Sequence, residues 1–240
     1  MIAVLPVEGL PEVEPGADLA SLIAGRARFQ DGDVLVIAQK AVSKAEGRVV
    51  RLSEVEPTER ARAFAGDDDP RHVQVILGET ARIVRSRPPL VIAETRHGFV
   101  CASAGVDASN APEPETLVLL PLDPDASAAA LRERLRELTG CELGVIVSDS
   151  FGRPFRQGTT DVAIGAAGLV TLRDLRGTPD ASGYELRSTQ IAVADEIAAA
   201  AELVLGKASS VPAAIVRGLD VAGDGSARDL VMPAERDLFR

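Results

Sequence analysis

Two short segments, about forty residues apart in the chain, hold most of the side chains that could do chemistry. Ala104–Asn110 contains Asp107, and Val145–Gly158 contains Asp149 followed by Ser150. Each carboxylate stands near glycine and a hydroxyl, just after an apolar run typical of a strand. Oxygen ligands and a closely approaching backbone are what a hard divalent cation and a phosphate group need. The alternative is that each aspartate only caps a turn, which is a common role of Asp beside Ser.

A second candidate is an anion site built from basic residues. Arg153 and Arg156 follow the second aspartate on one glycine-flanked loop, and a guanidinium can hold a phosphate or a carboxylate through two parallel hydrogen bonds. Solvated loop arginines are the alternative. Lys44 could reach a phosphate as a point charge, although a surface loop is the simpler interpretation. The small-residue turn at 206–210 could direct backbone N–H groups at an anion, or simply end a helix.

Other kinds of site are excluded by what the sequence lacks. His72 and His97 stand alone, and no Ser/His/Asp set, nucleophile elbow, Walker-type loop or G-x-G-x-x-G motif occurs. Cys101 and Cys141 have no metal-ligand spacing, so no zinc site is expected. A net charge of −10 argues against nucleic acid and anionic membrane surfaces as partners. No targeting segment and no apolar run near the roughly 20 residues of a membrane span occur, which predicts a cytoplasmic protein.

The elements that must position these residues follow from apolar runs and turn residues. Val34–Ala38 is a buried strand without a polar break. Asp123 begins a helix that Gly140 ends. The other expected strands are Met1–Val7, Leu90–Glu94 in a hairpin with Phe99–Ser103, Leu117–Leu120, Gly144–Val147 and Pro212–Arg217, and the other expected helices are Asp18–Ala24, Ser53–Ala65, Asp69–Ile83 and Ile191–Leu205.

This mixture of single strands, hairpins and helices predicts an α+β or irregular α/β fold rather than a regular doubly wound sheet. The chain has 240 residues, enough for one large domain or two small ones. Aromatic residues make up only 3% of it and Trp is absent, so the core has to be aliphatic. The break at Arg85–Pro89 is a candidate domain boundary.

With these segments identified, the chain resembles the coenzyme F-420-0:L-glutamate ligase family nearly end to end. The segments that carry the resemblance are Pro6–Pro11, Asp31–Val36, Ser43–Arg48, Ala104–Asn110, Leu122–Asp125, Ser148–Ser150 with Gly152-Arg153, Val193–Ala198 and Val216–Leu219. Several such segments in the right order are far more specific than any one of them. The resemblance implies an unusual two-domain fold with mixed sheets that forms a homodimer.

The resemblance also implies an activity. Members of this family are GTP-dependent ligases that join L-glutamate to the carboxylate of a deazaflavin precursor through an acyl phosphate, and they can add further γ-linked glutamates. Mg²⁺ or Mn²⁺ is implied as cofactor, with K⁺ as a further ion. A nitroreductase-like flavin domain, fused or separate, is an implied partner. The alternatives are another metal-dependent phosphoryl enzyme, or a non-catalytic guanine-nucleotide-binding module that regulates or assembles with a flavoprotein.

Family correspondence assigns roles to particular residues. Asp107, Asp149 and Ser150 would hold the metal. Arg153 and Arg156, which the residues themselves suggest as an anion site, are expected to be the catalytic residues that neutralise charge. The residues that would contact the nucleotide are Gly9, Leu10, Pro11, Glu12, Gln39, Lys40, Lys44, Asn110, Gly206, Lys207, Ala208, Ser209, Ser210 and Val211. The nucleotide-contacting domain would comprise residues 1–87 plus 190–240, and the metal and substrate domain residues 88–189.

Two residues depart from the pattern of archaeal members. Ser150 stands where Thr is common, which keeps the hydroxyl. Lys207 stands where an acidic residue is usual, which removes a ligand for a second metal ion. Either Lys207 neutralises phosphate charge itself, or the second ion is held by other groups.

Overall fold

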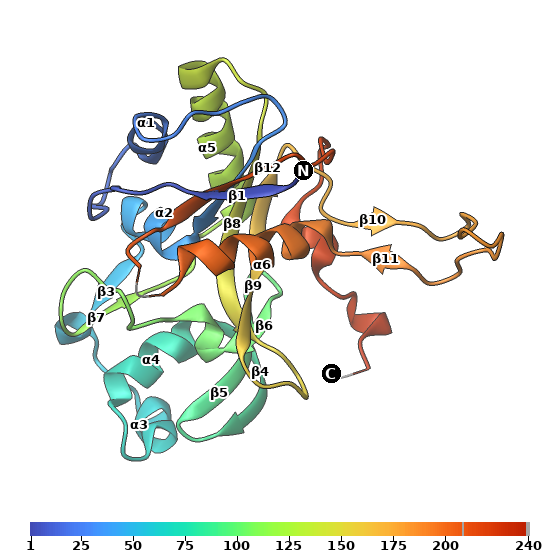
Figure 1. The fold of residues 1–240 in the computed structure, drawn as a ribbon. Helices are drawn as coiled ribbons and strands as arrows, with labels where there is room; N and C mark the ends of the chain where they lie inside the picture. Colours follow the sequence, from blue (N-terminus) through green and yellow to red (C-terminus); the bar gives the residue numbers. More distant parts are fainter. Residues whose placement is uncertain (208, 239–240) are drawn as a thin grey trace.

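The computed structural model describes residues 1–207 and 209–238, and its centre is a five-stranded sheet. β2 and β8 run parallel, and the other neighbours are antiparallel. Strands from the two ends and the middle of the chain therefore meet in one sheet (Figure 1). In spatial order the strands are β1 (Ala3–Pro6), β12 (Ala213–Arg217), β2 (Val34–Ala38), β8 (Gly144–Gly152) and β9 (Thr159–Ala167).

Helices cover both faces of this sheet. On one face, α1 (Leu19–Ala24) and α5 (Pro124–Thr139) pack on alternate strand residues such as Val145. On the other face, α6 (Val193–Leu205) packs on residues such as Ile146. Both layers are aliphatic, as the scarcity of aromatic residues predicts, and β2 is buried on both sides.

A smaller group of elements lies beside the sheet, around a core that includes Leu52, Ile76, Val91 and Leu117. The helix α2 (Gln39–Ala45) leads from β2 toward it. The members of this smaller group are η1 (Leu52–Glu54), α3 (Glu59–Ala65), α4 (Pro70–Glu79), the antiparallel sheet of β4 (Thr80–Arg87), β5 (Leu90–Thr95) and β6 (Val100–Ala102), and the pair β3 (Val49–Arg51) and β7 (Thr116–Val118).

The remaining elements are short. The hairpin of β10 (Arg173–Asp174) and β11 (Gln190–Ile191) projects from the body (Figure 1). The other 3-10 turns are η2 (Ser103–Gly105), η3 (Ala227–Leu230) and η4 (Ala234–Arg236). Within the described part of the chain, no helix combines the length and apolar character that crossing a membrane requires.

The α+β class and most element positions are confirmed. β2 occupies the predicted range Val34–Ala38. The Asp123 side chain accepts a hydrogen bond from the N–H of Ala126 at the start of α5, and Gly140 ends this helix in the left-handed conformation. The predicted hairpin of β5 and β6 is present. Local apolar runs and caps were therefore enough to place these elements along the chain.

Two predicted helices are wrong in part. In the range 53–65 only η1 and α3 are helical, because Pro57 interrupts the run and Thr58 caps α3. In the range 69–83 the helix stops at Glu79, because Thr80 begins a strand that pairs with β5. β8 extends beyond Val147, and β9 was not predicted.

The division into two domains stays a prediction. The candidate boundary at Arg85–Pro89 falls at the turn between β4 and β5, which pair with each other. The ranges 1–87 plus 190–240 and 88–189 both contribute strands to the five-stranded sheet, through β2 and β8. The site described below is built where these strands end.

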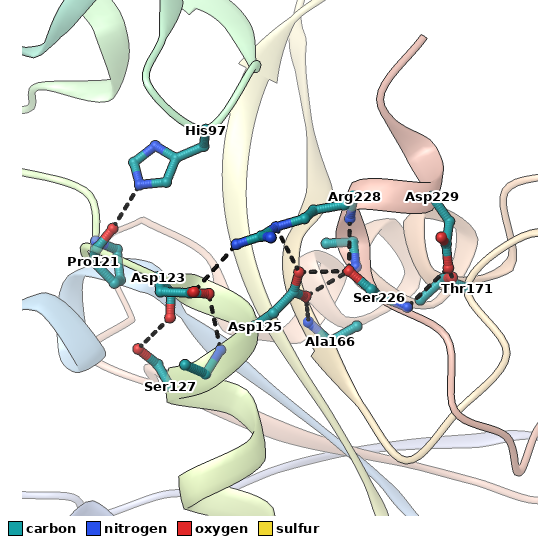
Figure 2. A network of polar contacts seen from close by, with 12 residues as sticks. His97, Pro121, Asp123, Asp125, Ser127, Ala166, Thr171, Ser226, Arg228 and Asp229 are labelled. Atoms are coloured by element: carbon teal, nitrogen blue, oxygen red, sulfur yellow. Dashed lines mark hydrogen bonds and ion pairs between the residues drawn. The ribbon is translucent and has the colours of Figure 1, made fainter. Parts of the chain in front are cut away.

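One carboxylate ties the start of α5 to β9 and to the C-terminal segment (Figure 2). Asp125 accepts hydrogen bonds from the N–H of Ala166 at 2.8 Å and from the N–H of Ala227 at 2.9 Å. Its other oxygen accepts from the hydroxyl of Ser226 at 2.6 Å. Asp125 thereby holds together three segments that are distant in the sequence: the start of α5, β9 and residues 226–227.

Gly165 allows α5 to lie directly against β9, and its replacement by alanine is expected to lower the free energy of unfolding by about 2–3 kcal/mol. A Cβ there would come within 2.2 Å of the carbonyl oxygen of Pro124, the first residue of α5. Backbone cannot move aside as a flexible side chain can. Thermal or urea denaturation measures the change. Gly78→Ala is the control, since a Cβ at Gly78 meets nothing within 4 Å, and parental stability in Gly165→Ala would contradict this packing.

Candidate active site

A cavity of about 580 Å³ opens where β2 ends. β2 stops at Ala38, opposite Ser148, whereas β8 continues to Gly152. The last residues of β8 therefore have no β2 neighbour and border the cavity instead. The other walls include residues 10–13, the start of α2, the turn after β6 and the segment that follows α6.

Asp107 is brought to this cavity by a tight turn after β6. Ser103, Ala104 and Gly105 have φ angles of 54°, 52° and 72°, a left-handed run that non-glycine residues rarely adopt. A Cβ at Gly105 would come within 2.7 Å of a leucine side chain, so only glycine fits there. The turn lets Asp107 exchange two backbone hydrogen bonds with Val118, at 3.0 and 2.8 Å. The strand β7, which ends at Val118, thus fixes the backbone of Asp107.

The carboxylate of Asp107 has two donors. It accepts from the ammonium group of Lys40 at 2.6 Å and from the N–H of Ser109 at 2.7 Å. Burial opposes ionisation of this group, but the hydrogen bonds from Lys40 and Ser109 outweigh burial and lower the pKa of Asp107 below its usual value. Asp107 is therefore a carboxylate at neutral pH.

Asp149 is in the opposite situation. Burial raises the pKa of its carboxyl group to about 7. The N–H of Ser150 and the charge of Lys40 oppose the rise, and the nearby carboxylates of Asp161 and Asp107 add to it. A positive ion at this place would favour the ionised form of Asp149.

Buried donors also face the cavity from α2. Lys44 is only 8% exposed, and its ammonium group pairs with Glu12. Gln39 is 1% exposed, and its Oε1 accepts from the hydroxyl of Ser43 at 2.8 Å. Among the described residues nothing accepts a hydrogen bond from Nε2 of Gln39. Because a buried amide without a partner is destabilising, this group is a donor available to a ligand.

The end of β8 presents side chains on both of its faces, since successive strand residues alternate. Asp149 lies on the same face as Val147, which packs with α1 and α5. Ser148 and Ser150 lie on the face of Ile146, which packs with α6. The cavity wraps around the free edge of β8, so it is lined from both faces.

Most of the predicted site residues line this one cavity. Asn110 donates from Nδ2 to the carbonyl oxygen of Lys207 at 3.2 Å, so the segment after α6 meets the Asp107 segment. The predicted residues in the cavity wall are Leu10, Pro11, Glu12, Gln39, Lys40, Lys44, Asp107, Asn110, Asp149, Ser150, Gly206, Lys207, Ser210 and Val211.

The other predicted residues lie elsewhere. Within the described part of the chain, Gly9, Ser209, Arg153 and Arg156 are outside the cavity wall. The two arginines stand on the exposed turn between β8 and β9. Ala208 lies outside the described residues. The functional roles assigned to all of these residues stay predictions.

Asp161 and Ser148 also line the cavity, although neither was predicted as a site residue. The signal for Asp161 was present, because residues 159–164 are rich in β-branched side chains and follow a turn that contains Gly158. Recognised as a strand, this run would have formed a hairpin with β8 and placed Asp161 opposite Ser150, as the register shows. The segment 101–103 was missed because its residues carry no metal-ligand pattern.

The donor set of the cavity fits a hard divalent cation. Carboxylate and hydroxyl oxygens are its preferred ligands, and Mg²⁺ usually takes only one or two carboxylates beside water and phosphate oxygens. Asp107 and Asp149, with Ser150, supply that number. Among the residues that the structure describes, no cluster of three or more His, Cys, Asp or Glu side chains is arranged to hold a metal ion. The set therefore suits an ion shared with a ligand, rather than one held by protein alone.

Known proteins resemble this chain over nearly its whole length. A family model described as F420-0:Gamma-glutamyl ligase matches residues 9–218. The protein of Methanopyrus kandleri named Coenzyme F420:L-glutamate ligase is 49% identical to this chain, over 98% of this chain and 98% of that protein. The corresponding protein of Archaeoglobus fulgidus is 46% identical over 100% and 96%, and that of Methanothermobacter thermautotrophicus is 46% identical over 100% and 99%. The chain therefore belongs to the F420-0:gamma-glutamyl ligase family.

Proposed function

We propose that this ligase joins L-glutamate through an amide bond to the carboxylate of a coenzyme F420 precursor, with GTP as the second substrate. The family membership and the 46–49% identity to proteins named Coenzyme F420:L-glutamate ligase support the glutamate and the F420 precursor. The observation that carries the proposal is the meeting of Asp107, Asp149, Lys40 and Lys44 in one cavity. Such a mixture of carboxylates and ammonium groups suits a nucleotide with its cation.

The reaction needs an activated carboxylate, because oxide is a poor leaving group. In the proposed sequence, the γ-phosphoryl group of GTP passes to a carboxylate oxygen of the precursor, which gives an acyl phosphate and GDP. The amine of glutamate then attacks the acyl carbon and loses a proton, the amide bond forms, and phosphate leaves with the bonding electrons. The protein contributes positioning and charge neutralisation.

The chain has the groups for this work. Lys40 and Lys44 are compact charges at the cavity wall, and each is paired with a carboxylate, that of Asp107 or that of Glu12. Phosphate oxygens are the kind of partner both ammonium groups accept. Nε2 of Gln39 adds a buried donor. The volume of about 580 Å³ falls within the roughly 300–1,000 Å³ of small-molecule sites.

Mg²⁺ or Mn²⁺ is proposed to be held by Asp107, Asp149 and Ser150, with K⁺ as a further ion. When bound, the divalent ion supplies positive charge that neutralises phosphate oxygens. The chain keeps Asp107 ionised through Lys40 and Ser109. Lys207, also in the cavity wall, is proposed to add charge toward the phosphates.

Several wider features belong to the same proposal. Arg153 and Arg156, on the turn beside Gly152, are proposed to meet negative charge on the substrates as these enter. The two-domain organisation, a homodimer, a cytoplasmic location, a nitroreductase-like flavin domain as partner and the addition of further γ-linked glutamates are proposed on the family resemblance alone.

Mass spectrometry of the deazaflavin product tests the proposal. Incubation of the chain with GTP, L-glutamate, the precursor and Mn²⁺ is expected to raise the mass of the precursor by one or more glutamyl units, with GDP and phosphate formed in step. Omission of glutamate is the control, and ATP in place of GTP tests the choice of nucleotide. GTP cleavage without a new amide would point to another phosphoryl enzyme. GTP binding without any turnover would point to a non-catalytic nucleotide-binding module.

A further inference from the structure

Asp161 is a buried carboxylate in the cavity wall that the proposed reaction does not yet use. It is 5% exposed and lies on β9 directly opposite Ser150 of β8. One of its oxygens accepts from the hydroxyl of Ser150 at 2.7 Å, and the other accepts from the hydroxyl of Ser148 at 2.8 Å. Asp161 thus holds the hydroxyl hydrogens of two neighbouring cavity residues.

A purely structural role does not require a charge at this position. β8 and β9 are already paired along the backbone from Val145 to Gly152. Among the residues that the structure describes, no lysine or arginine forms an ion pair with Asp161. A buried carboxylate without a cationic partner is destabilising unless something else compensates for it.

The direction of these hydrogen bonds has a chemical consequence. A hydroxyl has one hydrogen and two lone pairs. Because Asp161 takes the hydrogen of Ser150, the oxygen of Ser150 keeps its lone pairs free for a positive partner. Ser148 is 1% exposed, whereas Ser150 is half-buried, so Ser150 is the more open of the two hydroxyls toward the cavity.

We propose that Asp161 is a positioning residue of the cation site, which keeps the lone pairs of Ser150 directed at a divalent ion bound at the end of β8. This inference rests on the proposed function, because it takes that ion as given. Groups that hydrogen-bond a metal ligand fix its orientation, and their loss typically weakens metal affinity by about 10–100-fold. Asp161 acts through Ser150 and not by touching substrate.

Binding of Mn²⁺ to the full chain, followed through the paramagnetic resonance signal of the free ion, tests this role without turnover. Asp161→Asn keeps the size of the side chain and one acceptor oxygen. Its amide N–H₂ is a donor, however, and would face the hydroxyl of Ser148 or Ser150. We expect its Mn²⁺ dissociation constant to rise by about 10–100-fold. The Mn²⁺ concentration for half-maximal rate should rise with it, while the rate at saturating Mn²⁺ returns to within a few-fold of the parent.

Asp125→Asn is the matched control. Asp125 is also a largely buried aspartate that accepts a serine hydroxyl, that of Ser226, but it lies outside the cavity wall in the described residues. We expect this variant to lose thermal stability and to keep the parental Mn²⁺ affinity. An equal loss of affinity in Asp125→Asn would show that destabilisation alone explains the effect, and would overturn the positioning role.

A double-mutant cycle separates positioning from direct ligation. In a Ser150→Ala background, Asp161→Asn should change the Mn²⁺ dissociation constant by less than about 2-fold, because residues that act through one another are not additive. Additive effects, or parental Mn²⁺ affinity in a folded Asp161→Asn, would overturn the inference. If Asp161→Asn folds poorly, Asp161→Thr suits a strand and is expected to weaken Mn²⁺ equally. If Asp107→Ala and Ser150→Ala also bind Mn²⁺ with the parental affinity, the result would refute the cation site of the proposed function and not only the role of Asp161.

Discussion

Asp107→Ala is expected to lose amide synthesis by at least about 10³-fold while it folds like the parent chain. The carboxylate is the ionised member of the proposed cation site, and its backbone is fixed by the bridge to Val118. Alanine removes the ligand and keeps those two backbone hydrogen bonds. The side chain is 32% exposed, so loss of its pair with Lys40 should change the free energy of unfolding by only about 1 kcal/mol.

The measurement is the initial rate of product formation, with far-UV circular dichroism and the melting temperature of the same preparation. Asp174→Ala is the matched control, because Asp174 is also a carboxylate paired with a basic residue, Arg176, but lies on the projecting hairpin. We expect the control to keep the parental rate. A folded Asp107→Ala that makes product at the parental rate would remove Asp107 from the mechanism and leave the cation site without its ionised ligand.

The sequence predicted several strands and helices of this fold because their signals are local. An unbroken apolar run set the limits of β2, and the cap at Asp123 with the left-handed Gly140 set those of α5. Thr80 is an example of a residue that local signals do not place. The helical spacing of apolar residues continues past the end of α4, and only the pairing of Thr80 with Thr95 on β5 makes it a strand residue. That partner is distant in the sequence, so periodicity alone cannot find it.

The site shows the same division. The meeting of Asp107 and Asp149 could be expected from two carboxylates that each follow an apolar strand. Asp161 required a further step, because its place follows only when residues 159–164 are recognised as a strand in a hairpin register with β8. The free edge of β8 depends on β2 being shorter, which no single segment reveals. Strand lengths that differ between neighbours therefore decided the position of the cavity.

Asp149→Asn is expected to abolish amide synthesis and at the same time to stabilise the ligand-free protein above pH 7. The pKa of Asp149 is about 7 in the folded chain, raised by burial from the ordinary value of 3.8 for an aspartate. The folded state therefore holds a proton that the unfolded state has lost between about pH 4 and pH 7, and stability falls as the pH rises through that window. Above pH 7 the whole penalty of the buried charge is present.

Asparagine has the same shape, can still accept from the N–H of Ser150 and carries no charge, so it removes this penalty. Asp161, Asp107 and the thiol of Cys101, whose pKa burial raises to about 12, surround the position, and Lys40 is the cation that acts on it. We expect Asp149→Asn to unfold at higher urea concentration than the parent at pH 8, by on the order of 1–3 kcal/mol, with a smaller difference at pH 5.

Melting curves with and without Mn²⁺ at pH 8 complete the test of Asp149. The parent should gain stability when Mn²⁺ binds, since ligand binding to the folded state stabilises it, and Asp149→Asn should gain little because the ion has lost a charged ligand. Asp195→Asn is the control, because burial also raises the pKa of Asp195 but its carboxylate serves the N–H of Ala163 outside the cavity wall in the described residues. If Asp149→Asn is no more stable than the parent at pH 8, the charge of Asp149 does not destabilise the ligand-free fold. If the variant still gains the full stability from Mn²⁺, the charge of Asp149 does not hold the ion.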